Sequence, residues 1–148
     1  MKELAKNRRA FFDYTIIKKI EAGIELLGFE TKAAKTGKIN LAGSYVRIKD
    51  GQAWLVGASI SPYQPKNTPP EYDPERDRRL LLTRGEILSV GGKINESGLT
   101  VVPLRTYIKG RLVKVEIGLA RSKKKWDKRE VIRKRESDTE IRRTFKNK

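Results

Sequence analysis

The sequence predicts a domain dominated by antiparallel β-strands, curled into a closed or nearly closed six-stranded barrel with two or three short helices outside it. Three observations predict this fold class: apolar and polar residues alternate along several runs between residues 13 and 120, turn residues separate the runs, and helical patterns are few. A sheet of this size reduces its exposed edges by curling on itself. We expect the domain to span residues 1–121 and a basic tail to follow at 122–148.

The first half of the chain supplies four of the predicted strands. The runs DYTIIKKI (13–20) and EAGIELLGF (21–29) are expected to form the first pair. A hairpin follows within 44–60, because Asp50-Gly51 supplies the positive φ angles of a tight turn. Alternation along the second strand of this hairpin predicts one shared face, made by Trp54, Val56, Ala58 and Ile60.

The last two predicted strands have the clearest pattern. They cover 99–108 and 111–120 and meet at Lys109-Gly110. Pro103 has no N–H to donate, so it indicates an edge position or a bulge in the first of them. The second strand is expected to bury one face, made by Val113, Val115, Ile117 and Leu119.

Helical signals are confined to two segments. Thr83 and Glu86 fit a capping box that opens a helix over 83–97, with Gly98 after its end. A shorter helical turn is predicted over 31–36 and is ended by Gly37. Residues 61–75 contain five of the six prolines and are expected to form an extended loop.

Composition narrows the function. The chain carries 34 Lys or Arg against 18 Asp or Glu, a formal charge of +16, so polyanions are the expected partners and nucleic acid is the first of them. It has no Cys and no His, which excludes disulfides, thiolate nucleophiles, zinc knuckles and histidine proton transfer. We therefore expect no enzyme, no cofactor and no metal. Without a long apolar run or a signal-peptide core, the protein is expected to be cytoplasmic.

The tail differs from the domain in composition. Residues 122–148 hold twelve Lys or Arg, five Asp or Glu and few apolar side chains, too few to offset the ordering entropy of about 1 to 2 kcal/mol per residue. We expect the free tail to be disordered. It contains no Pro or Gly, so it is compatible with a helix about 40 Å long. Folding on a polyanionic surface is favoured over an inert solubilising extension.

Several stretches together resemble the small protein B family, the SsrA-binding proteins of bacteria. They occur in the family's order and cover residues 7–129 almost without a gap. The stretches are NRRAFFDYTI, EAGIELLGFETK, INLAGSYVRI, DPERDRRLLLTRGEI and GLTVVPLRTYIKGRLVKVEIGLARSKKKWDKR. As a set they are highly specific.

This resemblance implies a fold and a role. The fold is an antiparallel barrel related to the oligonucleotide-binding (OB) fold. The role is to bind the tRNA-like domain of transfer-messenger RNA, mimic an anticodon arm and enter stalled ribosomes in trans-translation. The tail then becomes helical in the vacant mRNA channel beside the decoding centre of the small subunit. The resemblance implies no membrane partner, and we expect a monomer.

Charged and polar residues in the matching stretches are candidates for RNA contact. The predicted RNA-binding residues are Asn7, Arg8, Arg9, Tyr14, Glu30, Lys32, Lys35, Lys38, Asn40, Arg76, Arg78, Arg79, Arg121, Lys123 and Lys124. Each has a structural alternative: solvated surface for a lysine, burial for Tyr14, an internal salt bridge for Glu30, a turn for Asn40 and local pairing for the arginines of 73–79. A carboxylate could instead accept from base amino groups.

The resemblance places the first predicted ribosome contacts at the root of the tail, at Trp126, Asp127, Lys128 and Arg129. Ile141 and Phe145 lie four positions apart, on one face of a helical tail, and are added as its apolar contacts. The chain departs from the family at Ser122, where Gly is usual, and at Trp126, where Tyr or His is usual. A positive φ at Ser122 would cost about 1 kcal/mol or more.

Two other functions compete with this one. A ribosomal or single-strand RNA-binding protein with an OB-type barrel would have the same composition. A nuclease would need a metal held by Asp73, Glu75 and Asp77, but the arginines interleaved with them would repel the ion.

Overall fold

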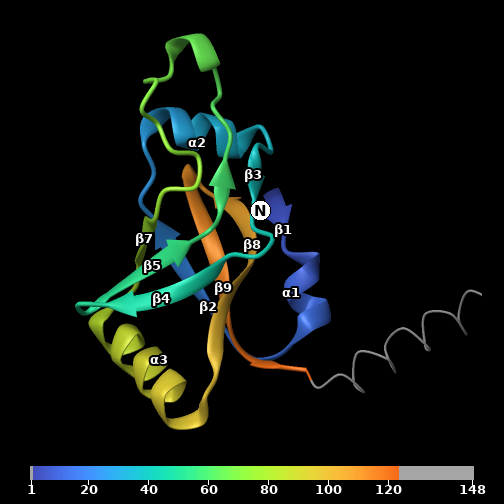
Figure 1. Cartoon of the computed structure of the whole chain (residues 1–148), viewed down its shortest axis with the longest axis vertical. Coiled ribbons are helices and arrows are strands. Elements are labelled where there is room, and N and C mark those ends of the chain that lie inside the picture. Colours follow the sequence, from blue (N-terminus) through green and yellow to red (C-terminus); the bar gives the residue numbers. More distant parts are fainter. Residues whose placement is uncertain (1, 124–148) are drawn as a thin grey trace, which may run out of the picture.

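A computed structural model describes residues 2–123 as a mostly β protein with helices at its periphery (Figure 1). The strands are β1 (Lys2–Lys6), β2 (Tyr14–Ile24), β3 (Ile39–Asn40), β4 (Tyr45–Lys49), β5 (Gln52–Val56), β6 (Ser59–Ile60), β7 (Arg78–Leu81), β8 (Thr100–Lys109) and β9 (Leu112–Ser122). The helices are α1 (Arg8–Asp13), α2 (Gly28–Lys35) and α3 (Arg84–Ser97), with a 3-10 turn, η1, at Pro65–Asn67. None of the helices in this described part is long and apolar enough to cross a bilayer.

One large antiparallel sheet organises the fold. Its seven strands follow the order β1-β8-β9-β2-β7-β5-β4, and β3 and β6 form a separate pair. The sheet curls so that β4 lies against β8 (Figure 1). Within residues 2–123 no hydrogen-bonded ladder joins β4 to the opposite edge, so the closed form of the predicted closed or nearly closed six-stranded barrel is wrong, and the sheet is a curved, open one of seven strands.

The N-terminal third holds the largest departures from the predicted elements. Strand β1 was not predicted, because only Leu4 and Ala5 in it are apolar. The expected pair over 13–20 and 21–29 is instead the single strand β2, which pairs with β9 and then with β7. Gly23 lies opposite Leu81 in the second pairing, and a Cβ at Gly23 would come within 3.1 Å of the Leu81 Cβ, a tight contact.

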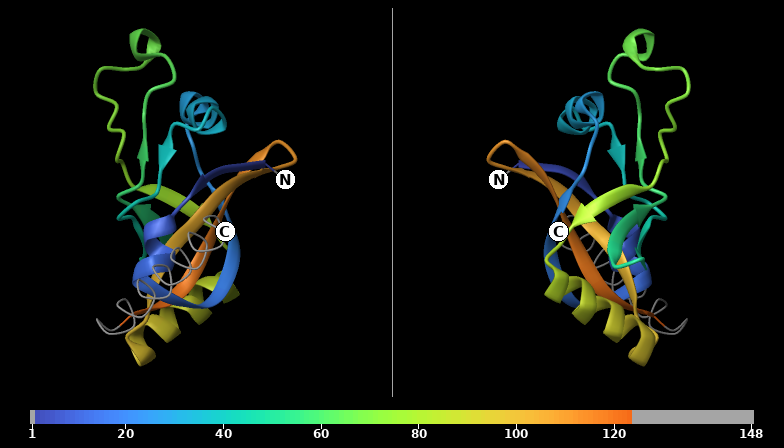
Figure 2. Two further views of the ribbon diagram at one scale, coloured as in Figure 1. Left: turned by 90° about the vertical axis from the view of Figure 1, so that its right-hand side faces the viewer. Right: turned by 90° about the vertical axis from the view of Figure 1, so that its left-hand side faces the viewer.

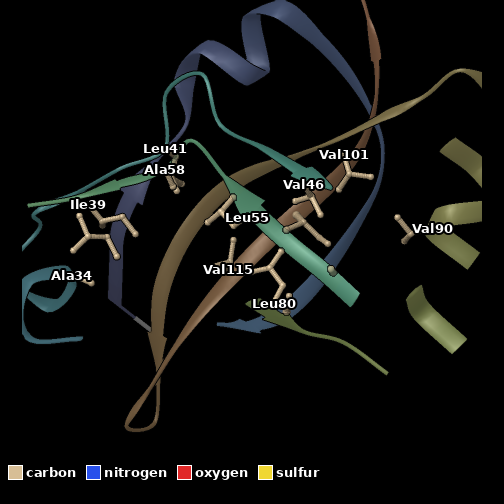
Figure 3. Close-up of a cluster of buried hydrophobic side chains, with 14 of the residues drawn as sticks. Ala34, Ile39, Leu41, Val46, Leu55, Ala58, Leu80, Val90, Val101 and Val115 are labelled. Carbon is tan, nitrogen blue, oxygen red and sulfur yellow. The ribbon is translucent and has the colours of Figure 1, made fainter. Parts of the chain in front are cut away.

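The hydrophobic core fills the concave side of the sheet. Figure 3 shows the side chains of Leu41, Val46, Leu55, Ala58, Leu80, Val101 and Val115 gathered between the strands. Ala34 on α2 and Val90 on α3 extend this cluster. The two helices lie at opposite ends of the molecule, α2 beside the proline-rich loop and α3 at the far end (Figure 2).

The predicted face of β5 is wrong. Ala53 and Leu55 are fully buried, whereas Trp54 and Val56 are half-buried on the outer side. The strand ends at Gly57, whose φ is +86°, and this left-handed residue resets the alternation. Ala58 and Ile60 beyond it are therefore buried although Trp54 and Val56 are not.

Other local predictions are confirmed. Asp50 (φ 53°) and Gly51 (φ 72°) form the β4–β5 turn. The β8–β9 ladder shifts register between Pro103 and Arg105, as a bulge requires. Val113, Val115, Ile117 and Leu119 are all buried.

Helix α3 begins where its capping box predicts. Thr83 Oγ1 accepts from the Glu86 N–H at 3.2 Å, and the Glu86 carboxylate accepts from the Thr83 N–H at 2.9 Å. Gly98 ends α3 in the left-handed conformation. Helix α2 is longer than the predicted 31–36 and starts at Gly28, while Gly37 (φ +81°) follows its end. The segment 61–75 is a loop interrupted only by η1.

Candidate nucleic-acid interface

A buried ionic cluster joins α2 to the strand β7 and the loop before it. Glu30 is fully buried on α2, and both of its carboxylate oxygens accept from the Arg76 guanidinium. Arg78, also fully buried, donates to Glu30 Oε2 through Nε at 2.9 Å and Nη2 at 2.7 Å. The same carboxylate accepts the Leu27 N–H at 2.8 Å and so caps α2. Glu30 thus fixes the helix to two arginines 46 and 48 positions away.

Tyr72 and backbone carbonyls complete the cluster. The Tyr72 hydroxyl lies 3.0 Å from Glu30 Oε2 and 2.9 Å from the Ile60 carbonyl, and it accepts from Arg78 Nη2 at 3.1 Å. Arg78 also donates to the carbonyls of Ala58 and Pro74 at 2.9 and 2.8 Å. The Tyr72 ring meets Phe29 of α2 edge to face, with centroids 4.8 Å apart. These contacts hold the proline-rich loop against α2.

The cluster keeps its charges at neutral pH. Burial raises the pKa of Glu30, but hydrogen bonds from Arg76, from the Leu27 N–H and from Arg78 outweigh it and hold this pKa at about 2. Burial and the Glu30 carboxylate raise the pKa of Tyr72, so its hydroxyl stays protonated and can donate. The arrangement is a joint in which two guanidinium groups share one carboxylate, so it keeps a net positive charge, and Arg76 is its partly exposed cation.

Two of the predicted RNA contacts therefore change role. The side chains of Glu30 and Arg78 have no exposed surface, so they cannot touch an RNA in this structure. The internal salt bridge is the alternative that the structure supports for Glu30. Arg76 keeps about a third of its side chain exposed (31%) while bound to Glu30. Arg79, the next residue after Arg78, is exposed.

The cations of α2 and the segment after it remain on the surface. Lys32, Lys35 and Lys38 are exposed. Lys38 Nζ lies 3.4 Å from the Pro62 carbonyl and so touches the proline-rich loop. Asn40 accepts the Ala42 N–H at 2.9 Å through its side chain, which is the turn role considered from the sequence.

Asn7 is a structural joint and not an exposed RNA contact. Its side chain is 4% exposed and caps α1 by accepting the Ala10 N–H at 3.2 Å. Its amide group donates to the carbonyls of Pro103 at 2.8 Å and Leu41 at 3.3 Å. Asn7 therefore ties α1 both to β8 and to the segment that follows Lys38 and Asn40.

Basic residues lie on the surface of α1, next to Asn7. Arg8 and Arg9 are exposed, and Arg9 forms an exposed pair with Asp13 at 3.4 Å. A hollow of about 300 Å³ beside them is lined by Asn7, Arg9, Ala10, Asp13, Tyr14, Gly43, Ser44, Tyr45, Thr100 and Val102. Tyr14 is half-buried in it and Tyr45 is exposed, while Tyr107 is buried with its hydroxyl 2.5 Å from Glu21.

The end of β9 is held against α1. Ser122 pairs with Tyr14 and Arg121 with Thr15, so the strand continues through Ser122. The Lys123 N–H donates to the Asp13 carbonyl at 2.9 Å, and Lys123 Nζ donates to the Phe11 carbonyl at 3.2 Å. Among residues 2–123 only Asp50 is a non-glycine residue with positive φ, so Ser122 carries no such strain.

The remaining predicted residues lie outside the described part of the chain. They are Lys124, Trp126, Asp127, Lys128, Arg129, Ile141 and Phe145. Tyr72 is the member of the ionic cluster that sequence reasoning missed, since nothing near it in sequence links it to Glu30. Within the described residues no group of acidic side chains could hold a metal ion.

The sequence was compared with protein families and with known relatives. Residues 4–147 match the family model described as SmpB protein. The chain is 48% identical to the SsrA-binding protein of a Sulfurihydrogenibium species, over 99% of this chain and 96% of the relative. It is 44% identical to the SsrA-binding protein of Thermosynechococcus vestitus, over 99% and 96%.

A solved structure is also similar. It is described as "tmRNA-SmpB: a journey to the center of the bacterial ribosome" and superposes with a TM-score of 0.68 at 41% identity, covering 87% of this chain and 94% of that one. The family match covers nearly the whole chain. This chain belongs to the SmpB protein family.

Proposed function

We propose that this protein binds the tRNA-like domain of transfer-messenger RNA and delivers it to stalled ribosomes in trans-translation. The family match and the relatives named SsrA-binding protein support this function. The similar structure pairs tmRNA with SmpB on the bacterial ribosome and supports the same partners. The ribosome puts the site of action in the cytoplasm. The role is recognition and delivery, and it needs no covalent chemistry from the protein.

The RNA-binding role is supported by exposed cations that lie on helices held in place by buried polar contacts. Exposed Arg8, Arg9, Lys32 and Lys35 are available for phosphates, while Asn7 and the Glu30 cluster hold the helices that bear them. Phosphate contacts supply most of the affinity for a polyanion and fix the register of the protein on it. Rigid placement of these cations favours a folded RNA of fixed shape over a flexible single strand.

Residues 1–121 are the RNA-binding unit in this proposal. The curled sheet is related to the OB fold, and residues 122–148 form the tail that enters the vacant mRNA channel. Trp126, Asp127, Lys128, Arg129, Ile141 and Phe145 are the proposed ribosome contacts of this tail. The attachment of Lys123 to α1 supports the division, because it gives the tail a fixed starting point beside the basic surface.

A binding comparison tests the RNA partner. The full chain is titrated into labelled tRNA-like RNA and into an unstructured RNA of the same length, at several salt concentrations. We expect tighter binding to the folded RNA and a steep weakening of both complexes with salt. Equal affinities would favour the alternative of a general single-strand RNA-binding protein.

Deletion of residues 130–148 tests the division between domain and tail. We expect the truncated protein to keep most of its affinity for the tRNA-like RNA but to lose peptide tagging on stalled ribosomes. Lys128→Ala with Arg129→Ala should likewise lower tagging more than affinity. Loss of RNA binding in a truncated protein that is still folded would contradict this division.

A further inference from the structure

Three strands on the convex side of the sheet place an aromatic ring between two arginines. In the ladders β4–β5 and β5–β7, Trp54 is the direct partner of both Arg47 and Arg79. Direct partners point to the same side of a sheet. Because Ala53 and Leu55 point into the core, these three residues lie on the outer face. They form one row across the strands, which we name the arginine–tryptophan row.

The arginine–tryptophan row borders a hollow, and its arginines have no ion-pair partner among residues 2–123. The hollow has a volume of about 250 Å³ and is lined by Arg47, Lys49, Asp50, Gln52, Trp54 and Asp77. Within residues 2–123, Arg47, Lys49 and Arg79 have no ion-pair partner. No described cation lies over the Trp54 ring either. The guanidinium groups of Arg47 and Arg79 are therefore available to a ligand, and the half-buried Trp54 side chain lines the hollow beside them.

The geometry fits one class of ligand well. Neighbouring strands are about 4.8 Å apart, so the backbones carrying Arg47 and Arg79 are separated by about 10 Å with the indole between them. An unpaired nucleotide can stack its base on an aromatic ring while arginines bind the adjacent phosphates. Asp50 and Asp77 supply acceptors for base amino groups in the same hollow. A base inside a duplex has no free face to stack in this way.

We propose that the arginine–tryptophan row is a second RNA contact, which takes an unpaired nucleotide with its base on Trp54 and its phosphates on Arg47 and Arg79. The proposal goes beyond the function above, since it requires no tRNA-like shape. It uses strands β4, β5 and β7 and none of the cations on α1 or α2. An unpaired nucleotide of the transfer-messenger RNA and one of ribosomal RNA would present the same chemistry.

Trp54 itself can report the contact. The chain has two tryptophans, so Trp126→Phe leaves Trp54 as the only indole of the full-length protein. A single-stranded RNA of about eight nucleotides is titrated in, with a blunt duplex of the same strand for comparison. We expect saturable quenching of Trp54 emission by the single strand and much weaker quenching by the duplex. Added tRNA-like RNA and added small ribosomal subunits then identify the source by which of them quenches.

Variants separate this contact from the proposed tRNA-like site. Arg47→Gln with Arg79→Gln should weaken the single-strand complex about ten-fold and lower its salt slope by about 1.4, two phosphates at about 0.7 each for single strands. Trp54→Ala, read by labelled RNA, should also weaken it about ten-fold, and Trp54→Phe should restore most of the binding. Arg84→Gln with Lys93→Gln, both exposed on α3, is the charge-matched control and should leave the quenching unchanged.

The outcomes are distinct. Lys32→Ala with Lys35→Ala should weaken the tRNA-like complex and leave the quenching of Trp54 by the single strand intact, so failure of one site does not imply failure of the other. If labelled single strand binds while Trp54 emission stays constant, the proposal is wrong. It is equally wrong if quenching survives unchanged when both arginines are replaced, or if the labelled single strand does not bind.

Discussion

The two faces of helix α2 use charge in opposite ways. Glu30, Ala33 and Ala34 lie at the i, i+3 and i+4 positions and are completely buried, whereas Lys32 and Lys35 fall outside this pattern and are exposed. The helical period therefore decides which charges serve the fold and which can meet a ligand. Charge count alone, read from the sequence, does not distinguish them.

The buried face depends on ion pairing and hydrogen bonding. Removing charges from water is costly unless each is paired and hydrogen-bonded. Glu30 receives donors from Arg76, Arg78 and Leu27, and Arg78 also reaches carbonyls of the loop. Loss of Glu30 would leave the buried Arg78 without its counter-charge. The exposed face has no such dependence, because water and salt screen its lysines.

The largest expected effect follows from removing the buried carboxylate. Glu30→Ala should lower the free energy of unfolding by about 3 to 5 kcal/mol, since Arg78 stays buried without its counter-charge. Urea unfolding followed by circular dichroism measures it. Glu71→Ala, which removes an exposed carboxylate of the nearby loop, is the matched control and should change stability by less than about 0.5 kcal/mol. Equal effects would show that the cluster is not the joint we describe.

Acid should weaken the same joint by a similar route. The pKa of Glu30 is about 2 in the folded protein, below its value of 4.5 in the unfolded chain. The carboxylate therefore contributes its full stabilisation above pH 4.5, and this is lost as the pH falls toward 2. The shift corresponds to about 3 kcal/mol.

Unfolding free energies measured between pH 2 and pH 6 test this dependence. Glu30→Gln lacks the titrating group, so its stability should fall less steeply over this range than that of the unmodified protein. Parallel curves for the two proteins would assign the acid sensitivity to other carboxylates.

Asn7 and Arg8 allow a smaller test, because Asn7 is buried and stabilises the fold whereas Arg8 is exposed and available to RNA. Asn7→Ala should cost about 1 to 2 kcal/mol, because α1 loses its cap and the carbonyls of Leu41 and Pro103 lose a donor. Arg8→Ala at the next position removes an exposed charge and should leave stability nearly unchanged. Thermal unfolding compares the stabilities of the two variants. If Arg8 binds phosphate, RNA titration should show the larger loss of affinity for Arg8→Ala.

Local chemistry predicted the β4–β5 and β8–β9 turns and the ends of α3, because each depends on neighbouring residues. It did not predict that β2 is one strand, because β2 continues through Gly23 and pairs there with Leu81, which lies far away in the sequence. The face of β5 was wrong for a similar reason. Gly57 breaks the alternation, and only the backbone conformation reveals it.

Some features of the candidate site were likewise predictable from the sequence and others were not. Exposure of Arg8, Arg9, Lys32 and Lys35 agrees with what the sequence predicted for surface cations. The burial of Asn7 and Arg78 could not be predicted, because it depends on partners more than 15 positions away in sequence, such as the Leu41 and Ala58 carbonyls. Sequence reasoning left Glu30 open between RNA and an internal pair, and the positions of Arg76 and Arg78 decide it.

The exposed face of α2 should show the smallest effect on stability and a clear effect on binding. Lys32→Ala with Lys35→Ala removes two unpaired surface charges and should change the unfolding free energy by less than about 0.5 kcal/mol. If both lysines bind phosphates of the tRNA-like RNA, the slope of log affinity against log salt should become less steep by about 1.8, or about 0.9 for each contact to duplex. Fluorescence anisotropy at four or so salt concentrations measures this slope. Arg84→Ala with Lys93→Ala removes the same charge from α3 at the opposite end of the molecule (Figure 1). An identical change in slope for both pairs would mean that the RNA responds only to net charge, and α2 would then have no special place in recognition.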